Sequence, residues 1–395
     1  MRPVRASEKS KHHQEKIRRL VALQLVWFAK NSRDLPWRRT RDPYAIWVSE
    51  IMLQQTQVKT VIPYWERWMR ELPTIESLAG ASSEKIHKLW EGLGYYTRVR
   101  NMQKAAQFIV ANHGGKFPEK FDDVLALSGI GRYTAGAICS IAFNQPTPIL
   151  DGNVIRVLTR VFAIGENPRD KITNGRLWNL AEELVQNAKT KAPNSKIKTR
   201  NSKLETRNPK YSCSALNESL MELGALICTP RSPRCLICPI AKHCRARQLN
   251  RVEEFPNSAK RAEITERRFA AFVLERNGKF LVRQRPAGVV NAHLWEFPNI
   301  EFSGGKTDFR ALAKSVLGFP PKTFQSLGTI RHSITRYRIA LEAFSVNGIQ
   351  SPRVSPDSAR WLSIAELRKL SFPSAHGKIL KWISDERDSA RRSQY

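Results

Sequence analysis

Apolar residues in the first 250 positions recur at helical spacing. In the segment from Ile17 to Phe28 they fall on one helix face. Asp42 followed by Pro43 predicts an N-cap and a first helical residue for a helix that continues through Val58. Further helices are expected at 83–91, 98–111, 133–143 and 153–162. Since no segment of this region alternates convincingly as a strand would, the region is predicted to be almost wholly helical.

The pattern changes after about residue 252. Two short apolar runs, 268–275 and 279–284, flank Asn277 and Gly278, which is a strong signal for a β-hairpin. A further strand is expected at 336–344 and a helix at 309–317. The predicted architecture is therefore multidomain: a mostly α module at 14–250, a linker at 251–264 and an α+β domain at 265–383.

A basic segment interrupts the helical region. Residues 189–210 carry eight basic side chains and one acidic one, and the sequence from Asn194 to Arg200 is nearly repeated from Asn201 to Arg207. Low complexity and few apolar residues favour a solvated surface insertion, placed at 189–212, which could touch DNA without specificity.

The charge balance restricts the choice of partner. The 395 residues include 66 Lys and Arg against 35 Asp and Glu, a formal net charge of +31. Such a charge favours a polyanion, either nucleic acid or an anionic membrane surface. The mean hydropathy is −0.43, and neither a membrane-spanning apolar run nor a signal peptide is recognisable. We therefore expect a cytoplasmic protein that does not span a membrane, and with nucleic acid as the polyanion it would have no membrane partner.

Four of the six cysteines lie within 17 residues. Cys228, Cys235, Cys238 and Cys244 are separated by six, two and five residues, a spacing that suits one iron–sulfur cube or one zinc ion. Zinc ribbons usually have two C-x-x-C knuckles, and only one is present here, so a [4Fe–4S] cluster is favoured. Basic residues around the cysteines would place the cluster loop against phosphate.

Two glycines stand just ahead of the helix expected at 133–143. Gly129 and Gly131 would expose backbone N–H groups at a helix N-terminus, which is a phosphate site, although an ordinary tight turn has the same pattern. Followed by Thr134-Ala-Gly-Ala137, the turn becomes the signature of a helix-hairpin-helix element that binds DNA.

Two acidic residues have unusual surroundings. Asp151 is expected to cap the helix at 153–162, and the backbone N–H bonds of a cap favour the ionised carboxylate. Glu50 is a lone acid in a mostly apolar helix, with no Lys or Arg three or four residues away. If Glu50 is buried, its pKa rises and it can hold a proton near neutral pH.

At these residues the chain resembles the adenine DNA glycosylases of the MutY family, from about residue 16 to 383. The matching blocks are Leu35–Arg38, Ser49–Val58, Gly92–Tyr96, Leu127–Ala137, Leu150–Val154 with Arg156 and Arg160, the four-cysteine loop and Trp295–Pro298. The resemblance implies a helix-hairpin-helix glycosylase with one [4Fe–4S] cluster and a Nudix-like C-terminal domain. It also implies a monomeric, nucleoid-associated enzyme of base excision repair acting on double-stranded DNA.

For the chemistry, the resemblance implies hydrolytic removal of a flipped adenine that is mispaired with 8-oxoguanine or guanine. Glu50 would be the general acid and base, Asp151 would stabilise the oxocarbenium-like sugar, and Tyr133 would assist them. The residues implied in binding the substrate are Arg38 and Glu218 in the adenine pocket, Gln55 and Tyr95 as wedges beside the lesion, and Asn153, Gly129, Gly131 and Thr335. Alternatively, Tyr95 and Tyr96 are core aromatics.

Two rival functions stay open from the residues. An endonuclease III-like glycosylase/lyase for oxidised pyrimidines would need a lysine where Tyr133 stands, and it lacks an acid at the place of Glu50. A non-catalytic DNA-binding protein would have no need of both Glu50 and Asp151.

The C-terminal domain departs from two patterns. The helix at 309–317 has no glutamate to hold magnesium, so no pyrophosphohydrolase activity is expected. Where bacterial members carry Phe-Ser-His, this chain has Ile334, Thr335 and Arg336. The preference for 8-oxoguanine over guanine is therefore harder to predict than adenine excision.

Overall fold

The protein divides into two compact units. The computed structural model describes residues 3–189, 212–257, 263–303, 307–334, 336–347 and 359–392. The first unit combines Met1–Ala79 with Met102–Lys260, and the second combines Gly80–Asn101 with Arg261–Tyr395. This division differs from the domain limits expected from the sequence, because it assigns Gly80–Asn101 to the second unit. The limits expected from the sequence therefore stay predictions. The predicted insertion at 189–212 falls almost entirely outside the described residues.

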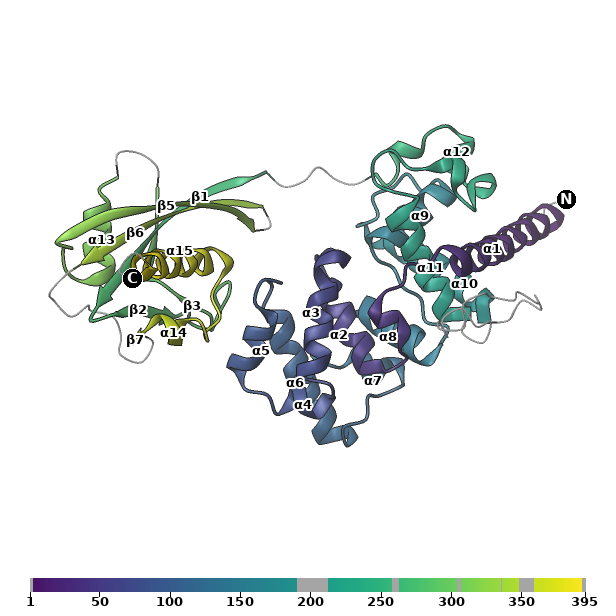
Figure 1. Ribbon diagram of the computed structural model, residues 1–395. Coiled ribbons are helices and arrows are strands. Elements are labelled where there is room, and N and C mark those ends of the chain that lie inside the picture. The colour runs from purple at the N-terminus through teal and green to yellow at the C-terminus, as the bar shows by residue number, and fades with distance from the viewer. Residues whose placement is uncertain are drawn as a thin grey trace. The chain divides into compact units, whose positions relative to one another are not determined.

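The first unit is helical throughout its described part (Figure 1). Its helices are α1 (Pro3–Asn31), η1 (Pro36–Arg39), α2 (Pro43–Leu53), α3 (Val58–Glu71), α4 (Ile75–Ala79), α7 (Phe121–Leu125), α8 (Arg132–Phe143), α9 (Gly152–Phe162), α10 (Lys171–Lys189), α11 (Ser212–Leu226), η4 (Cys235–Ile237), η5 (Ala241–His243), α12 (Arg245–Gln248) and η6 (Val252–Glu254). Helix α6 (Thr97–His113) begins in the second unit and ends in the first.

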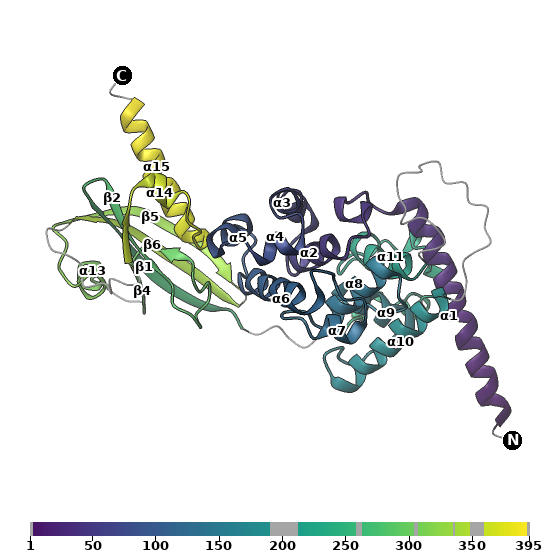
Figure 2. The ribbon, with the colours of Figure 1, turned by 90° about the horizontal axis from the view of Figure 1, so that it is seen from below.

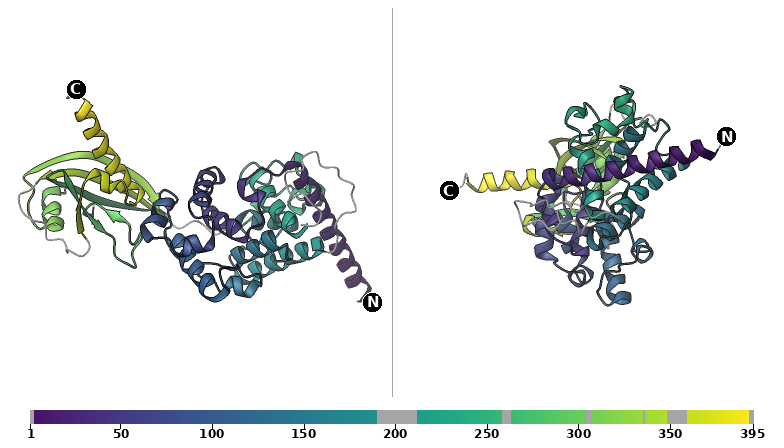
Figure 3. Two further views of the ribbon diagram at one scale, coloured as in Figure 1. Left: turned by 60° about the horizontal axis from the view of Figure 1, so that its bottom comes forward. Right: turned by 90° about the vertical axis from the view of Figure 1, so that its right-hand side faces the viewer.

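Helix α11 lies at the centre of this unit. It packs against α1, α8, α9 and α10, and its apolar residues share one buried cluster with residues of α1, α9 and α10. The N-terminal part of α1 extends beyond the other helices of the unit (Figure 3). None of the described helices is long and apolar enough to cross a membrane.

The helix expected from Asp42 to Val58 is shorter than predicted. Asp42 caps α2 by accepting a hydrogen bond from the Tyr44 amide, with Pro43 as the first helical residue. The helix ends at Leu53, however, because Gln55 adopts a left-handed φ of 58°. An L-residue rarely takes this conformation, and it cannot continue an α-helix. The chain therefore turns before α3 begins at Val58, and this turn borders the pocket described below.

The second unit is built on a mixed seven-stranded sheet with the order β3-β2-β1-β6-β5, to which β4 and β7 are added by pairing with β1 and β2. Strands β1 and β6 are parallel, and the other pairs are antiparallel. The elements of this unit are α5 (Ser83–Trp90), β1 (Thr265–Arg276), β2 (Lys279–Gln284), β3 (Trp295–Glu296), β4 (Asn299–Phe302), α13 (Phe309–Leu317), β5 (Thr323–Ile334), β6 (Tyr337–Asn347), β7 (Ala359–Leu362), α14 (Ile364–Leu367) and α15 (Ser374–Arg392).

The apolar run of β1 is explained by helices on both faces of the sheet (Figure 2). Ala271 and Val273 pack into a cluster with α15, whereas Phe272 and Leu274 pack into another with α13. Because side chains alternate along a strand, a strand covered on both faces is apolar at every position. The predicted hairpin at Asn277-Gly278 is confirmed by the pairing of Arg276 with Lys279.

Candidate active site

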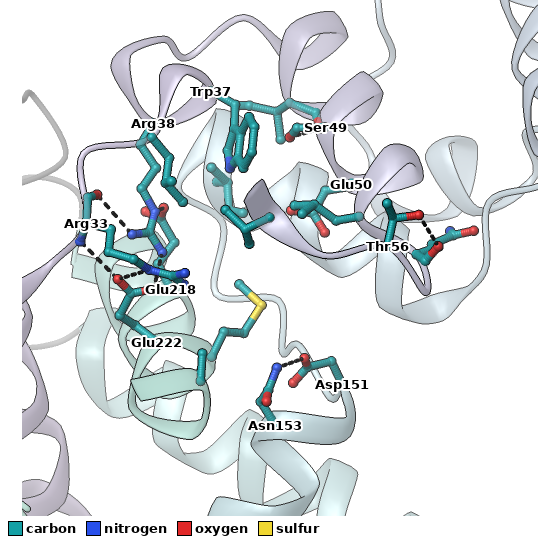
Figure 4. Close-up of a pocket in the computed structure, with 18 of the residues that line it drawn as sticks. Arg33, Trp37, Arg38, Ser49, Glu50, Thr56, Asp151, Asn153, Glu218 and Glu222 are labelled. Carbon is teal, nitrogen blue, oxygen red and sulfur yellow. Dashed lines mark hydrogen bonds and ion pairs between the residues drawn. The ribbon is translucent and has the colours of Figure 1, made fainter. Parts of the chain in front are cut away.

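One cavity of about 370 Å³ opens in the first unit. Its walls come from η1, the C-terminal half of α2, the start of α8, the loop before α9 and the face of α11 (Figure 4). Seven of the residues singled out in the sequence line it: Arg38, Glu50, Gln55, Tyr133, Asp151, Asn153 and Glu218. The tertiary structure therefore brings together residues that are up to 180 positions apart.

Glu50 is buried in this cavity, with 5% of its surface exposed. The hydroxyl of Tyr133, on α8, donates a hydrogen bond of 2.7 Å to Glu50 Oε2. Burial, together with the nearby charges of Asp151 and Glu218, raises the pKa of Glu50 to about 7, although the Tyr133 hydrogen bond lowers it. Burial also raises the pKa of Tyr133, which therefore stays neutral and acts as a donor. Glu50 can thus hold a proton near neutral pH, as the sequence predicted.

Asp151 is the N-cap of α9. Its Oδ1 accepts a hydrogen bond of 2.7 Å from the Val154 amide, and its Oδ2 accepts one of 2.8 Å from the Asn153 side chain. The cap is confirmed, and its hydrogen bonds favour the ionised carboxylate as predicted. Burial raises the pKa of Asp151 and outweighs the lowering by the capping bonds, by Asn153 and by the charge of Arg156.

The opposite wall carries a closed network of charges. Arg38 is 8% exposed and donates from Nε to Glu218 at 2.9 Å and from Nη2 to Glu222 at 3.1 Å. Arg33 contacts Glu222 through its backbone amide, its Nε at 2.9 Å and its Nη2 at 2.6 Å. The remaining oxygen of Glu218 accepts a bond from Ser214 at 3.3 Å. This wall is therefore fixed in place by ion pairs and hydrogen bonds.

Sequence reasoning missed Arg33 and Glu222, which both line the cavity. A signal for Glu222 was present: it lies four residues after Glu218 in the otherwise mostly apolar α11. This spacing places both carboxylates on one helix face. Two acids on a buried helix face need cations, and the stretch from Arg33 to Arg39 is the part of the chain that supplies them.

The two residues expected to wedge into DNA both have left-handed backbones. Gln55 has a φ of 58° and lies exposed at the rim of the cavity. Tyr95 has a φ of 48° and is 41% exposed, whereas its neighbour Tyr96 is buried. The alternative that both tyrosines are core aromatics is thus right for Tyr96 only. Tyr95 belongs to the second unit.

Gly129 and Gly131 are not among the residues that line the cavity. They lie in the turn between α7 and α8, where Gly129 has a φ of 77° and Gly131 is the N-cap of α8 without a side-chain hydrogen bond. The first amides of α8 are therefore not satisfied by a capping side chain. The turn joins two helices as predicted, and phosphate binding at the N-terminus of α8 stays a prediction.

The four clustered cysteines converge on a second cavity. Cys228, Cys235, Cys238 and Cys244 all line it, beside Arg160 and Arg247. Burial raises the pKa of Cys238 to about 12. Within the described residues, no three His, Cys, Asp or Glu side chains are placed to share a single metal ion. The donor set and its common cavity nevertheless fit an iron–sulfur cluster, which is larger than one ion and is held by thiolates.

Two buried arginines of α9 hold the cysteine loop. Arg160 is 1% exposed and donates to Cys228 Sγ at 3.3 Å, and to the carbonyl oxygens of Thr229 and Pro230. Arg156 donates to the Cys228 carbonyl at 2.7 Å and to Asn153 Oδ1 at 2.8 Å. Since Asn153 also bonds Asp151, a continuous hydrogen-bond chain connects the cysteine loop with the cavity.

In the second unit, the segment expected to read the opposite base lies at the connection between β5 and β6. Thr335 itself falls outside the described residues. Ile334 ends β5, and the Arg336 guanidinium lies over the Tyr337 ring at 5.2 Å from its centroid. Helix α13 is capped by Asp308 and, as its sequence requires, carries no glutamate.

Comparison with known proteins identifies three parts of the chain. Residues 48–183 match the HhH-GPD superfamily of base excision DNA repair proteins. Residues 228–244 match the iron-sulfur binding domain of endonuclease III, and residues 270–382 match the NUDIX domain. The protein is therefore a helix-hairpin-helix DNA repair enzyme with an iron–sulfur binding domain and a Nudix-like C-terminal domain, which confirms the predicted fold class.

Whole-chain similarity gives the family. The adenine DNA glycosylase of Mus musculus is 34% identical over 426 residues, covering 93% of this chain and 78% of that protein. The adenine DNA glycosylase of Buchnera aphidicola subsp. Schizaphis graminum (strain Sg) is 30% identical and covers 91% and 97%. A solved thermostable thymine-DNA glycosylase is 28% identical, covers 60% of this chain and 98% of that one, and has a TM-score of 0.50. The chain belongs to the adenine DNA glycosylase family.

Proposed function

We propose that the protein removes adenine from DNA where it is mispaired with 8-oxoguanine or guanine. The observation that carries the proposal is the pair of buried carboxylates, Glu50 and Asp151, in one cavity whose other wall is closed by Arg38 and Glu218. Hydrolysis of a glycosidic bond needs one carboxyl group that donates a proton and a second, ionised carboxylate that stabilises the sugar cation, and Glu50 and Asp151 can fill these two roles. The base must leave the stack to reach them, because its reacting atoms are inaccessible in a duplex.

Glu50 is the proposed general acid. With a pKa of about 7 it holds a proton that it donates to a ring nitrogen of the extruded adenine, which turns the base into a leaving group. The glycosidic C–N bond then breaks, and its electron pair stays with the base. The Glu50 carboxylate, still bonded to Tyr133, takes a proton from the water that adds to the sugar carbon.

Asp151 is the proposed stabiliser of the positive charge that develops on the sugar. Its two oxygens are oriented by the Val154 amide and by Asn153, so the carboxylate is held in one position. Stabilisation by a fixed charge costs little reorganisation during the reaction. A transient covalent bond from Asp151 to the sugar would serve the same purpose.

The proposed reaction is monofunctional. A glycosylase/lyase needs an amine that attacks the sugar and forms a Schiff base. The position after Gly131-Arg132 is Tyr133, whose buried hydroxyl donates to Glu50 and cannot supply an amine. Water is therefore the proposed nucleophile, and the DNA strand stays intact.

Recognition of the mispair is proposed to come from both units. Arg38 and Glu218 line the wall that would contact adenine, while Gln55 and Tyr95 would each wedge into the duplex beside the lesion. The segment around Thr335 would read the opposite base. Basic residues in both units would contact phosphates of the DNA duplex. We expect the protein to act as a monomer and to be associated with the nucleoid.

For the iron–sulfur binding domain we propose one [4Fe–4S] cluster, held by Cys228, Cys235, Cys238 and Cys244. When bound, the cluster supplies a rigid, covalently closed loop rather than a reactive centre. Arg160 and Arg156 then connect this loop with α9. Four iron and four sulfide atoms per chain are expected from chemical analysis, on the stoichiometry of such a cube, and one zinc ion would contradict the assignment.

The function is tested by single-turnover assays on duplexes that carry 8-oxoguanine:adenine, guanine:adenine, thymine:adenine or an oxidised pyrimidine. We expect free adenine from the first two only, with a strand that breaks only after alkaline treatment. Strand cleavage without that treatment would indicate a lyase. Release of the oxidised pyrimidine instead of adenine would favour the endonuclease III-like function.

A further inference from the structure

The loop that presents Tyr95 is strained and internally braced. Gly92, Gly94 and Tyr95 all have positive φ values, of 103°, 68° and 48°. Trp90 Nε1 donates to the Gly94 carbonyl at 2.9 Å, and Arg98 donates to the same carbonyl and lies over the Tyr95 ring. Non-glycine residues in the left-handed region persist only where their surroundings hold them. The position of Tyr95 thus depends on the residues around this loop.

Just before the loop, Lys88 of α5 and Glu91, which follows the end of α5, bind the segment that follows α14. Glu91 Oε1 accepts a hydrogen bond of 3.1 Å from the Phe372 amide. Lys88 Nζ donates to the Leu370 carbonyl at 3.1 Å. Lys88 and Glu91 also pair with each other at 2.6 Å. One ion pair therefore satisfies both a donor and an acceptor of the turn that follows α14.

Just after the loop, Arg100 connects to the same part of the second unit. Arg100 Nη1 donates to the Ala292 carbonyl at 3.1 Å. Ala292 lies shortly before β3, and the Trp295 amide of β3 donates to the Ser371 carbonyl in the turn that Glu91 and Lys88 hold. The Phe372 ring stacks on Phe297, which directly follows β3, at a centroid distance of 5.9 Å. Both ends of the Tyr95 loop are thus anchored to one framework around β3.

We propose that Lys88 and Glu91 are positioning residues, which hold the Tyr95 loop in register with the sheet whose β5–β6 connection would read the base opposite adenine. The proposal rests on the function proposed above. It adds that Tyr95 and the β5–β6 connection belong to one rigid part of the second unit. Binding of the β5–β6 connection to the opposite base would therefore also fix the position of Tyr95. The energy of the contact at the opposite base is then available for extrusion of adenine.

The test uses the full-length protein and two substitutions of Glu91. Glu91→Leu removes the acceptor of the Phe372 amide and the partner of Lys88. Glu91→Gln keeps a carbonyl oxygen for the amide and loses only the charge. Glu84→Gln is the control, because Glu84 is an exposed acid of the same helix with no contact to residues 370–372 among the bonds of the described chain. Thermal unfolding shows whether each variant is folded.

Single-turnover adenine release is measured on 8-oxoguanine:adenine and guanine:adenine duplexes. Leaving a buried donor without an acceptor costs enough free energy to change an equilibrium constant about tenfold. We therefore expect Glu91→Leu to slow adenine release about tenfold on the 8-oxoguanine:adenine duplex and less than about twofold on the guanine:adenine duplex. Glu91→Gln should recover most of the loss. Glu84→Gln should match the unsubstituted protein.

A double-mutant comparison isolates the route through Tyr95. If Glu91 acts by positioning Tyr95, Glu91→Leu adds less than about twofold to the loss that Tyr95→Ala causes alone. Additive losses, equal losses on both duplexes, or no loss in folded Glu91→Leu would each overturn the proposal while adenine release by the parent protein still supports the function. Absence of adenine release by the parent would instead overturn the function itself.

Discussion

The two walls of the active-site cavity both contain buried glutamates, but one wall raises the pKa of its glutamate and the other lowers it. On the α2 wall, Glu50 has the neutral Tyr133 hydroxyl as its partner, and burial raises its pKa to about 7. On the α11 wall, burial alone would raise the pKa of Glu222, but hydrogen bonds from Arg33 and the charge of Arg38 lower it to about 2. The same side chain at similar depth is a proton carrier in one place and a permanent anion in the other.

The difference shows how a buried acid is assigned a role. No cation of the described residues forms a hydrogen bond or ion pair with Glu50, so its charge is costly and the proton is retained. Glu222 is fully covered and accepts four bonds from two guanidinium groups and one amide, so its charge is compensated. The first wall can exchange a proton with a substrate, whereas the second provides a rigid surface against which a base can be held.

The largest expected effect follows from removing the exchangeable proton. Glu50→Gln keeps the shape and a hydrogen-bond partner for Tyr133 but cannot donate a proton. Loss of a general acid costs about 10²–10⁴-fold, and here the same residue also activates water, so adenine release should become undetectable or fall near the upper end of that range. Duplex binding, measured by fluorescence anisotropy, should change little. Near-normal release by this variant would show that the acid is another residue.

Breaking the second wall should mainly affect stability. Glu222→Leu leaves the buried guanidinium of Arg38 and the partly buried one of Arg33 without a shared anion. Removing one partner of a buried ion pair typically costs about 3–5 kcal/mol, which we expect as a lower free energy of unfolding in urea. The control is Glu15→Leu, which breaks an exposed pair with Arg19 and should change stability little. Equal stability of the two variants would contradict the proposed division of roles.

The smallest effect, and the sharpest comparison, is the pH dependence. Because Glu50 must be protonated to act, single-turnover rates should fall about tenfold per pH unit above about 7 and level off below it. The folded pKa of Glu50 is raised, so its contribution to stability is complete below about pH 4.5 and is lost as pH rises through 7.

Glu222 should show the opposite sign. Its folded pKa is lowered, so its contribution is present above about pH 4.5 and is lost as pH falls toward 2. Urea unfolding of Glu50→Gln, Glu222→Leu and the parent protein at several pH values measures both slopes. Two slopes of the same sign would mean that the walls do not differ as described.

Much of the local structure followed from short-range patterns. Asp42 and Asp151 were predicted as caps because a carboxylate before a helical run satisfies its free amides, and both caps are present. The hairpin at Asn277-Gly278 and the helix from Phe309 to Leu317 were equally readable. The end of α2 was not, because a left-handed Gln55 has no signal in the residue type.

The sequence by itself determined the chemistry that was available: one unpaired acid in an apolar helix, one capping acid and four cysteines at cluster spacing. Only the tertiary structure decided what each group does. It placed Tyr133 against Glu50, and it buried Asp151 deeply enough to raise its pKa despite the cap. It also gave Glu222 two arginines that lie 189 and 184 residues away in the chain. Burial and the distance to a neighbouring charge set the protonation of an acid, and neither is a property of the local sequence.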